Sequence, residues 1–179
     1  MGEDKKIHKK ETGDGANRIQ KFIRYKIYLL RYKLNQNLKM TSTEEHNKKI
    51  KEHSDEINDA IEQGIENKPI TIGFHCSACA LQYLELYLHS TNKIPIGKVI
   101  KHDWFKKPQQ EQKIEPLIER KLPVVFPKKQ EIYNLIYDIE DKRESLLYGK
   151  PAKGQIKGML DSFLKLKEIF TELLKNGKN

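Results

Sequence analysis

The sequence predicts an all-α protein, an antiparallel helical bundle of about five main helices with an extra basic N-terminal helix. Two observations predict this fold class. First, apolar residues recur at spacings of three and four along most of the chain, as in amphipathic helices, and no segment alternates as a strand does. Second, hydrophobic residues make up 37% and charged residues 33% of the 179 residues. That balance suits helices whose long Lys and Glu side chains cover the outer surface.

The first part of the chain divides into a tail and one helix. Residues 1–16 are charged, contain glycine and lack periodicity, so we expect a disordered tail. Residues 17–40 form the expected basic, aromatic helix. Its apolar stripe consists of Ile19, Phe22, Ile23, Ile27, Leu30, Leu34 and Leu38. Its aromatic and basic residues are Tyr25, Tyr28, Tyr32, Lys21, Arg24, Lys26, Arg31 and Lys33.

Residues 41–179 are expected to form the bundle. Its first helix should begin after Ser42, because Ser followed three residues later by Glu45 is a capping-box pattern. This helix should end before Pro69. The segment from about Ile70 to Ser90 is the most apolar of the chain and contains several small residues, which allow a neighbour to approach closely. We therefore expect it to be the central core helix.

The second half of the bundle should contain two short and two long elements. They are a short amphipathic piece at 99–105, a short helix at 111–121, a long helix at 128–148 and a closing helix at 152–174. Pro123 and Pro127 bracket an extended connection before the first long helix. Gly149 and Pro151 should separate the two long helices, the first as a C-cap and the second as a stop.

Composition limits the class of protein. No apolar stretch approaches the roughly 20 residues needed to cross a bilayer, and the N-terminus has no hydrophobic region that could act as a secretion signal. Two cysteines cannot build a disulfide framework, so we expect a cytoplasmic protein. The net charge of +9 favours anionic partners such as RNA, although solvated lysines explain it as well.

The sequence offers little support for a metal or cofactor. Cys76 and Cys79 form a lone Cys-x-x-Cys pair inside an apolar helix. Structural zinc needs four ligands, usually from two separated pairs, and no second pair exists. We expect these cysteines to be small core residues, and we expect no metal and no cofactor.

Arg143 is the most informative single residue. It lies on the apolar stripe formed by positions 132, 136, 139 and 146. A buried, unpaired guanidinium would cost several kcal/mol. Arg143 must therefore reach solvent at a helix end, pair with a buried carboxylate such as Glu85, or face a groove. Either of the last two arrangements would make it a site.

The residues around Arg143 resemble the HEPN (higher eukaryotes and prokaryotes nucleotide-binding) superfamily. Its members carry an Arg, then four to six residues, then usually His, and many archaeal and bacterial members have Tyr five positions after the Arg. Here Tyr148 keeps that offset, on the penultimate helix of the bundle. The upstream phrases Phe74-His75-x4-Ala80-Leu81 and Lys101-His102-Asp103 also resemble the family. The resemblance covers about residues 55–174.

The resemblance implies a homodimeric bundle that binds nucleotide or RNA. In active members, Arg and His of two protomers cleave RNA without a metal, with His as general base and Arg stabilising phosphate charge. It assigns the catalytic positions to Arg143 and Tyr148. The expected nucleic-acid-binding residues are Arg143, Tyr148 and His102, together with Arg24 and Arg31 of the basic helix. Family members often act as the toxin partner of a small nucleotidyltransferase, which makes such a protein an expected partner.

The sequence departs from the family in one respect that bears on catalysis. No histidine follows Arg143, and tyrosine, with a pKa near 10, is a poor base at neutral pH. Tyr148 could instead hydrogen-bond a phosphate or stack on a base. Binding without cleavage therefore fits as well as ribonuclease activity.

Three alternatives stay open. The chain could be a non-enzymatic helical protein–protein interaction domain, in which Arg143 is structural. His102 could be a surface histidine beside Trp104, with the tryptophan as a core anchor. The helix at 18–39 could dock on an anionic membrane, although a bundle or dimer helix would show the same pattern.

Overall fold

The computed structural model describes residues 12–40, 42–107 and 114–176, with side chains of the first segment described from Arg18 to Tyr32. These residues form helices and turns without a strand, which confirms the all-α fold class. The α-helices are α1 (Thr12–Met40), α2 (Thr43–Glu62), α3 (Pro69–Ser90), α4 (Leu117–Lys121), α5 (Lys129–Tyr148) and α6 (Lys153–Asn176). Two short 3-10 turns, η1 (Ile65–Asn67) and η2 (His102–Phe105), lie between them.

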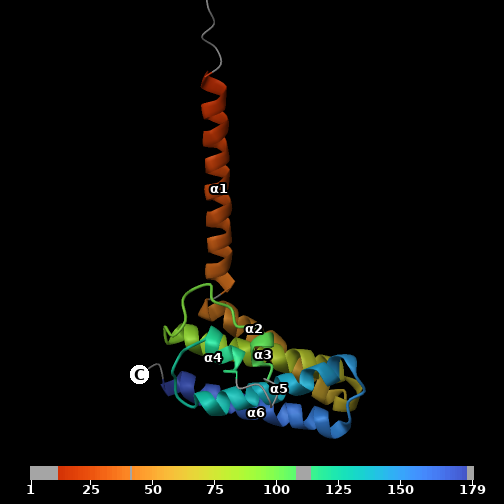
Figure 1. Cartoon of the computed structure of the whole chain (residues 1–179). Helices are drawn as coiled ribbons and strands as arrows, with labels where there is room; N and C mark the ends of the chain where they lie inside the picture. Colours follow the sequence, from red (N-terminus) through yellow and green to blue (C-terminus); the bar gives the residue numbers. More distant parts are fainter. Residues whose placement is uncertain (1–11, 41, 108–113, 177–179) are drawn as a thin grey trace, which may run out of the picture.

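The long helices α2, α3, α5 and α6 pack side by side as the bundle (Figure 1). The central helix is α3, as the sequence predicts, because it packs against each of the other three. Its Ile72, Cys76, Leu84 and Leu88 are fully buried. These side chains are separated by four or eight residues, a spacing that places them on one helix face towards the core.

Local signals in the sequence set the ends of these helices. The Ser42 hydroxyl accepts a hydrogen bond from the Glu45 N–H at 3.1 Å, which confirms the predicted start of α2. Pro69 occupies the first turn of α3, where its missing N–H costs nothing. Gly149 is the C-cap of α5, and its N–H donates to the Ser145 carbonyl.

The cysteines behave as predicted core residues. Cys76 and Cys79 are both fully buried on α3. Burial raises the pKa of the Cys79 thiol to about 11 and raises the pKa of Cys76 further. Both thiols are therefore protonated and unreactive at neutral pH.

The short elements differ from the sequence prediction. Of the helix expected at 111–121, residues 117–121 are helical as α4, residues 114–116 are irregular, and residues 111–113 lie outside the described part. The piece expected at 99–105 is helical only in η2. Its core residue is Phe105, which packs edge-on against Tyr133 and Tyr137. Trp104 is half-buried and packs against the edge of the core, so it contacts the core as expected, but Phe105 is the residue that enters it.

Helix α1 lies apart from the bundle. It projects away from the other helices (Figure 1), and among the described elements it contacts α2 alone. It begins at Thr12, so residues 12–16, which we expected in the disordered tail, are helical. Residues 1–11 of that expected tail lie outside the described residues. No helix in the described chain is both long enough and apolar enough to cross a membrane.

Candidate functional site

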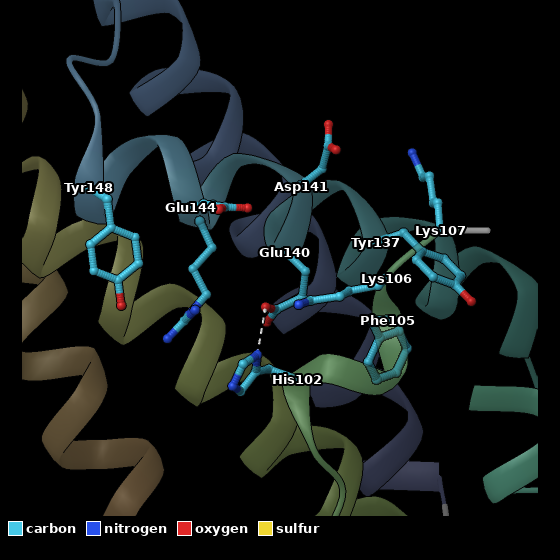
Figure 2. A pocket seen from close by; sticks show the side chains of 10 residues that line it. His102, Phe105, Lys106, Lys107, Tyr137, Glu140, Asp141, Glu144 and Tyr148 are labelled. Atoms are coloured by element: carbon cyan, nitrogen blue, oxygen red, sulfur yellow. Dashed lines mark ion pairs between the residues drawn. The ribbon is translucent and has the colours of Figure 1, made fainter. Parts of the chain in front are cut away.

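An open cavity of about 410 Å³ lies between η2 and one face of α5 (Figure 2). It brings together three of the predicted site residues, His102, Arg143 and Tyr148. The complete lining is His102, Phe105, Lys106, Lys107, Tyr137, Glu140, Asp141, Arg143, Glu144 and Tyr148. Residues from two separate stretches of the sequence thus face a single hollow.

The α5 side of the cavity follows from helical periodicity. Tyr137, Glu140, Asp141, Glu144 and Tyr148 recur at spacings of one, three and four residues. Side chains at those spacings lie on one face of an α-helix. The opposite face of α5 is apolar and packs against α3 and α6, so Asp141, Glu144 and Tyr148 are exposed, whereas Tyr137 and Glu140 lie at the buried floor of the cavity.

The η2 side is held by α3. Glu85 is buried, and its Oε1 accepts a hydrogen bond from the backbone N–H of Ile100 at 2.5 Å. His89, one turn later, contacts the carbonyl of Lys98 through its Nε2 at 3.1 Å. These two contacts fix the chain just before His102 and therefore position the histidine at the cavity.

His102 sits between two carboxylates. Its Nδ1 lies 3.2 Å from Asp103 Oδ1. The same Nδ1 lies 3.9 Å from Glu140 Oε2, and the dashed line in Figure 2 marks this ion pair. Glu140 is held in turn by Ser77, whose hydroxyl donates to Glu140 Oε1 at 2.5 Å. Both carboxylates thus lie on the Nδ1 side of the His102 ring, an arrangement that can orient an imidazole.

The surroundings of Glu140 change the pKa of its carboxyl. Burial raises the pKa of the Glu140 carboxyl, while the Ser77 hydrogen bond and the charges of Arg143 and His102 oppose that rise. Glu140 thus interacts with Arg143, three residues later on α5, as well as with His102. It links the two residues that the sequence analysis assigned to the site.

Arg143 is half-buried at the cavity rather than paired with Glu85. The carboxylate of Glu85 instead contacts Ile100, Gln82 and His46. Arg143 therefore faces the cavity and also lies near a buried carboxylate, that of Glu140, because its charge opposes the rise in the Glu140 pKa. The partner suggested on the central helix was wrong, because Glu85 is engaged with the connection to η2.

The cavity has a balanced set of charges. Lys106, Lys107 and Arg143 oppose the carboxylates of Glu140, Asp141 and Glu144. Asp141, Glu144 and the two lysines are exposed, whereas the Glu140 side chain is only 6% exposed. The positive and negative charges of the lining nearly cancel. Binding of an anion here would therefore depend on direct contacts with Arg143 and the lysines rather than on a net positive charge of the cavity.

Two predicted residues lie elsewhere. Arg24 and Arg31 are on α1, exposed and outside the cavity. Conversely, the sequence analysis missed Lys106, Lys107 and Glu140. The signal for Glu140 was its position three residues before Arg143, on the same helix face.

Comparisons with protein-family models, curated proteins and solved structures gave no match to this chain. Within the described residues, no group of three or more His, Cys, Asp and Glu side chains is arranged to hold a metal ion. A functional assignment has to come from the cavity between η2 and α5.

Proposed function

We propose that this chain is a HEPN-like domain that binds the phosphate groups of a nucleotide or an RNA strand in the cavity between η2 and α5. One observation carries the proposal. His102 lies far from Arg143 and Tyr148 in the sequence, yet all three line the same open cavity. All three belong to sequence motifs that resemble those of the HEPN family.

The side chains suit a phosphate–sugar–base ligand. The guanidinium of Arg143 offers a planar set of donors that matches two phosphate oxygens. Lys106 and Lys107 add positive charge at the rim. The ring of Tyr148 is 78% exposed, so it is free to stack on an unpaired base.

His102 supports RNA cleavage as a second activity of the same cavity. It offers an imidazole where the sequence motif around Arg143 lacks one. In a metal-independent cleavage, His102 Nε2 would take the proton of the 2′-hydroxyl, and the 2′-oxygen would attack the adjacent phosphorus. The bond to the 5′-oxygen would break, that oxygen would gain a proton from water, and a cyclic phosphate would remain. Arg143 would stabilise the developing phosphate charge.

The resemblance also supports two partners. A second copy would place two Arg143–Tyr148 faces around a twofold axis, as in HEPN-type dimers. A small nucleotidyltransferase would be the antitoxin-type partner.

Titration of a fluorescent single-stranded RNA, followed by anisotropy at low and moderate salt, tests the binding proposal. Arg143→Gln should weaken binding by about 1–3 kcal/mol, the effect of losing a charge-assisted hydrogen bond. Lys157→Gln is the matched control, since it removes the same charge from an exposed residue of α6 outside the cavity. Equal affinities for the two variants, or no binding by the parent at low salt, would contradict the proposal and favour the non-enzymatic interaction domain.

Incubation of the RNA with excess chelator tests cleavage separately. The parent should release a product that ends in a 2′,3′-cyclic phosphate, and His102→Asn should abolish it while RNA binding persists. Binding without cleavage by the parent would limit the function to recognition.

A further inference from the structure

Helix α1 presents an apolar face that no described part of the bundle covers. Ile19, Ile23, Ile27 and Leu30 recur along this face at spacings of three and four residues, and each is between 47% and 66% exposed. A continuous row of exposed aliphatic side chains usually marks an interaction surface. Helix α1 projects from the bundle (Figure 1), and the bundle leaves these four side chains uncovered.

The charge of α1 restricts what can cover that face. The segment from Arg18 to Tyr32 contains five basic residues and no acidic residue. Those residues are Arg18, Lys21, Arg24, Lys26 and Arg31. The covering surface should therefore be anionic as well as apolar.

A second copy of α1 fits poorly. If Ile23, Ile27 and Leu30 form the seam of a coiled coil, the flanking positions are Arg24, Lys26 and Arg31. In a parallel pair, Lys26 of one helix would face Arg31 of the other. In an antiparallel pair, arginine would face arginine and lysine would face lysine. Both pairings place like charges together at each edge of the seam.

We propose that α1 lies in the plane of an anionic lipid surface. Its aliphatic face would enter the boundary between headgroups and acyl chains, and the cations on both edges would contact the headgroups. Arg24 and Arg31 border the face on one side and Lys26 borders it on the other, as helical spacing requires. At 29 residues the helix is about 44 Å long, and it is not apolar enough to cross a membrane.

The position of the tyrosines on α1 distinguishes a lipid surface from RNA as the ligand of this helix. Tyr25, Tyr28 and Tyr32 lie on the side opposite the seam, where Tyr28 and Tyr32 stack with ring centroids 6.4 Å apart. An RNA strand would use these rings and the arginines and would leave the aliphatic face in water. A lipid surface uses the aliphatic face and the cations together. The proposal thus assigns Arg24 and Arg31 to lipid headgroups rather than to RNA.

Sedimentation of the full-length chain with vesicles tests the proposal. The probes are vesicles of phosphatidylcholine alone and of phosphatidylcholine mixed with phosphatidylglycerol. The parent should sediment only with the mixed vesicles, and added salt should weaken the binding. Ile23→Gln combined with Leu30→Gln should reduce vesicle binding at least about tenfold, because the inserted face is lost.

The matched control is Tyr28→Ser combined with Tyr32→Ser, which alters the opposite side of the same helix and should leave vesicle binding unchanged. Circular dichroism of both double variants would verify that their helix content equals that of the parent. The proposal is overturned if the parent ignores mixed vesicles, binds both kinds equally, or loses vesicle binding in the tyrosine variant alone. It is also overturned if the vesicles fail to bind while RNA binding depends on the tyrosines of α1.

Discussion

Replacing Glu85 by glutamine should remove a pH-dependent loss of stability. The Glu85 side chain is almost fully buried on α3, where it accepts the Ile100 N–H and lies 3.3 Å from Gln82 Nε2. Burial raises the pKa of this carboxyl to about 7, against an ordinary value of 4.5. The folded protein therefore holds a proton that the unfolded chain releases.

The sign of the effect follows from proton linkage. Below the ordinary pKa both states are protonated, and the contribution of Glu85 to stability is complete. As the pH rises from about 4.5 to about 7 that contribution is lost. At about 1.4 kcal/mol per pKa unit, the loss is about 3 kcal/mol. The glutamine amide stays neutral, and its oxygen can still accept the Ile100 N–H.

Four histidines, one buried and three half-buried, act in the opposite direction. Burial lowers the pKa values of His46, His53, His75 and His89. As the pH falls through 6.5, their ordinary pKa, these side chains take up protons in the unfolded chain more readily than in the folded protein. The free energy of unfolding therefore decreases. His46 is also 3.9 Å from Glu85. The effect of Glu85 must therefore be measured as the difference between variant and parent at each pH.

Urea unfolding, followed by far-ultraviolet circular dichroism at mildly acidic and mildly alkaline pH, gives that difference. The advantage of Glu85→Gln over the parent should grow by up to about 3 kcal/mol towards alkaline pH. Glu62→Gln, an exposed substitution at the end of α2, should show no such growth. A Glu85→Gln difference that is the same at both pH values would refute the reasoning.

Three further predictions concern the bundle and its assembly. Light scattering should give twice the monomer mass of 21.1 kDa at micromolar concentration, and a monomer would disprove the dimer. Arg143→Leu should change the free energy of unfolding by no more than about 1 kcal/mol, because Arg143 is partly exposed and solvent screens its interaction with Glu140. A loss of roughly 3–5 kcal/mol in urea unfolding would indicate a buried ion pair instead. Gly73→Ala should destabilise the protein by roughly 1–3 kcal/mol, because the new Cβ would lie 2.6 Å from Leu147 Cδ1 and 2.8 Å from Leu146 Cβ. A higher urea midpoint for the variant than for the parent would contradict this and would show that α5 moves aside.

The long helices were predictable because their information is local. The three- and four-residue periodicity, the Ser42 cap, Pro69 and Gly149 each act within a few residues, and the structure has helix ends where they predict them. The short elements were not predictable in the same way. Whether Trp104 or Phe105 reaches the core depends on the approach of Tyr133 and Tyr137 from a distant helix.

The sequence pointed to His102, Arg143 and Tyr148, which line the cavity, but it indicated neither their arrangement nor the presence of Lys106, Lys107 and Glu140. An arginine on an apolar stripe reveals that Arg143 needs a special environment, and the motif offset selects Tyr148. Nothing local indicates that Glu85 holds Ile100 and so brings η2 to α5. Lys106 and Lys107 join the cavity only through that tertiary contact.

Photocrosslinking most directly tests the central claim that RNA binds between η2 and α5. A single-stranded RNA that carries photoreactive thiouridine would be bound at low salt, irradiated and digested, and the modified peptides would be identified by mass spectrometry. Crosslinks should fall on His102 or Tyr148, the aromatic rings of the cavity other than the buried Phe105 and Tyr137. Crosslinks confined to α1, or to any surface away from these residues, would contradict the account.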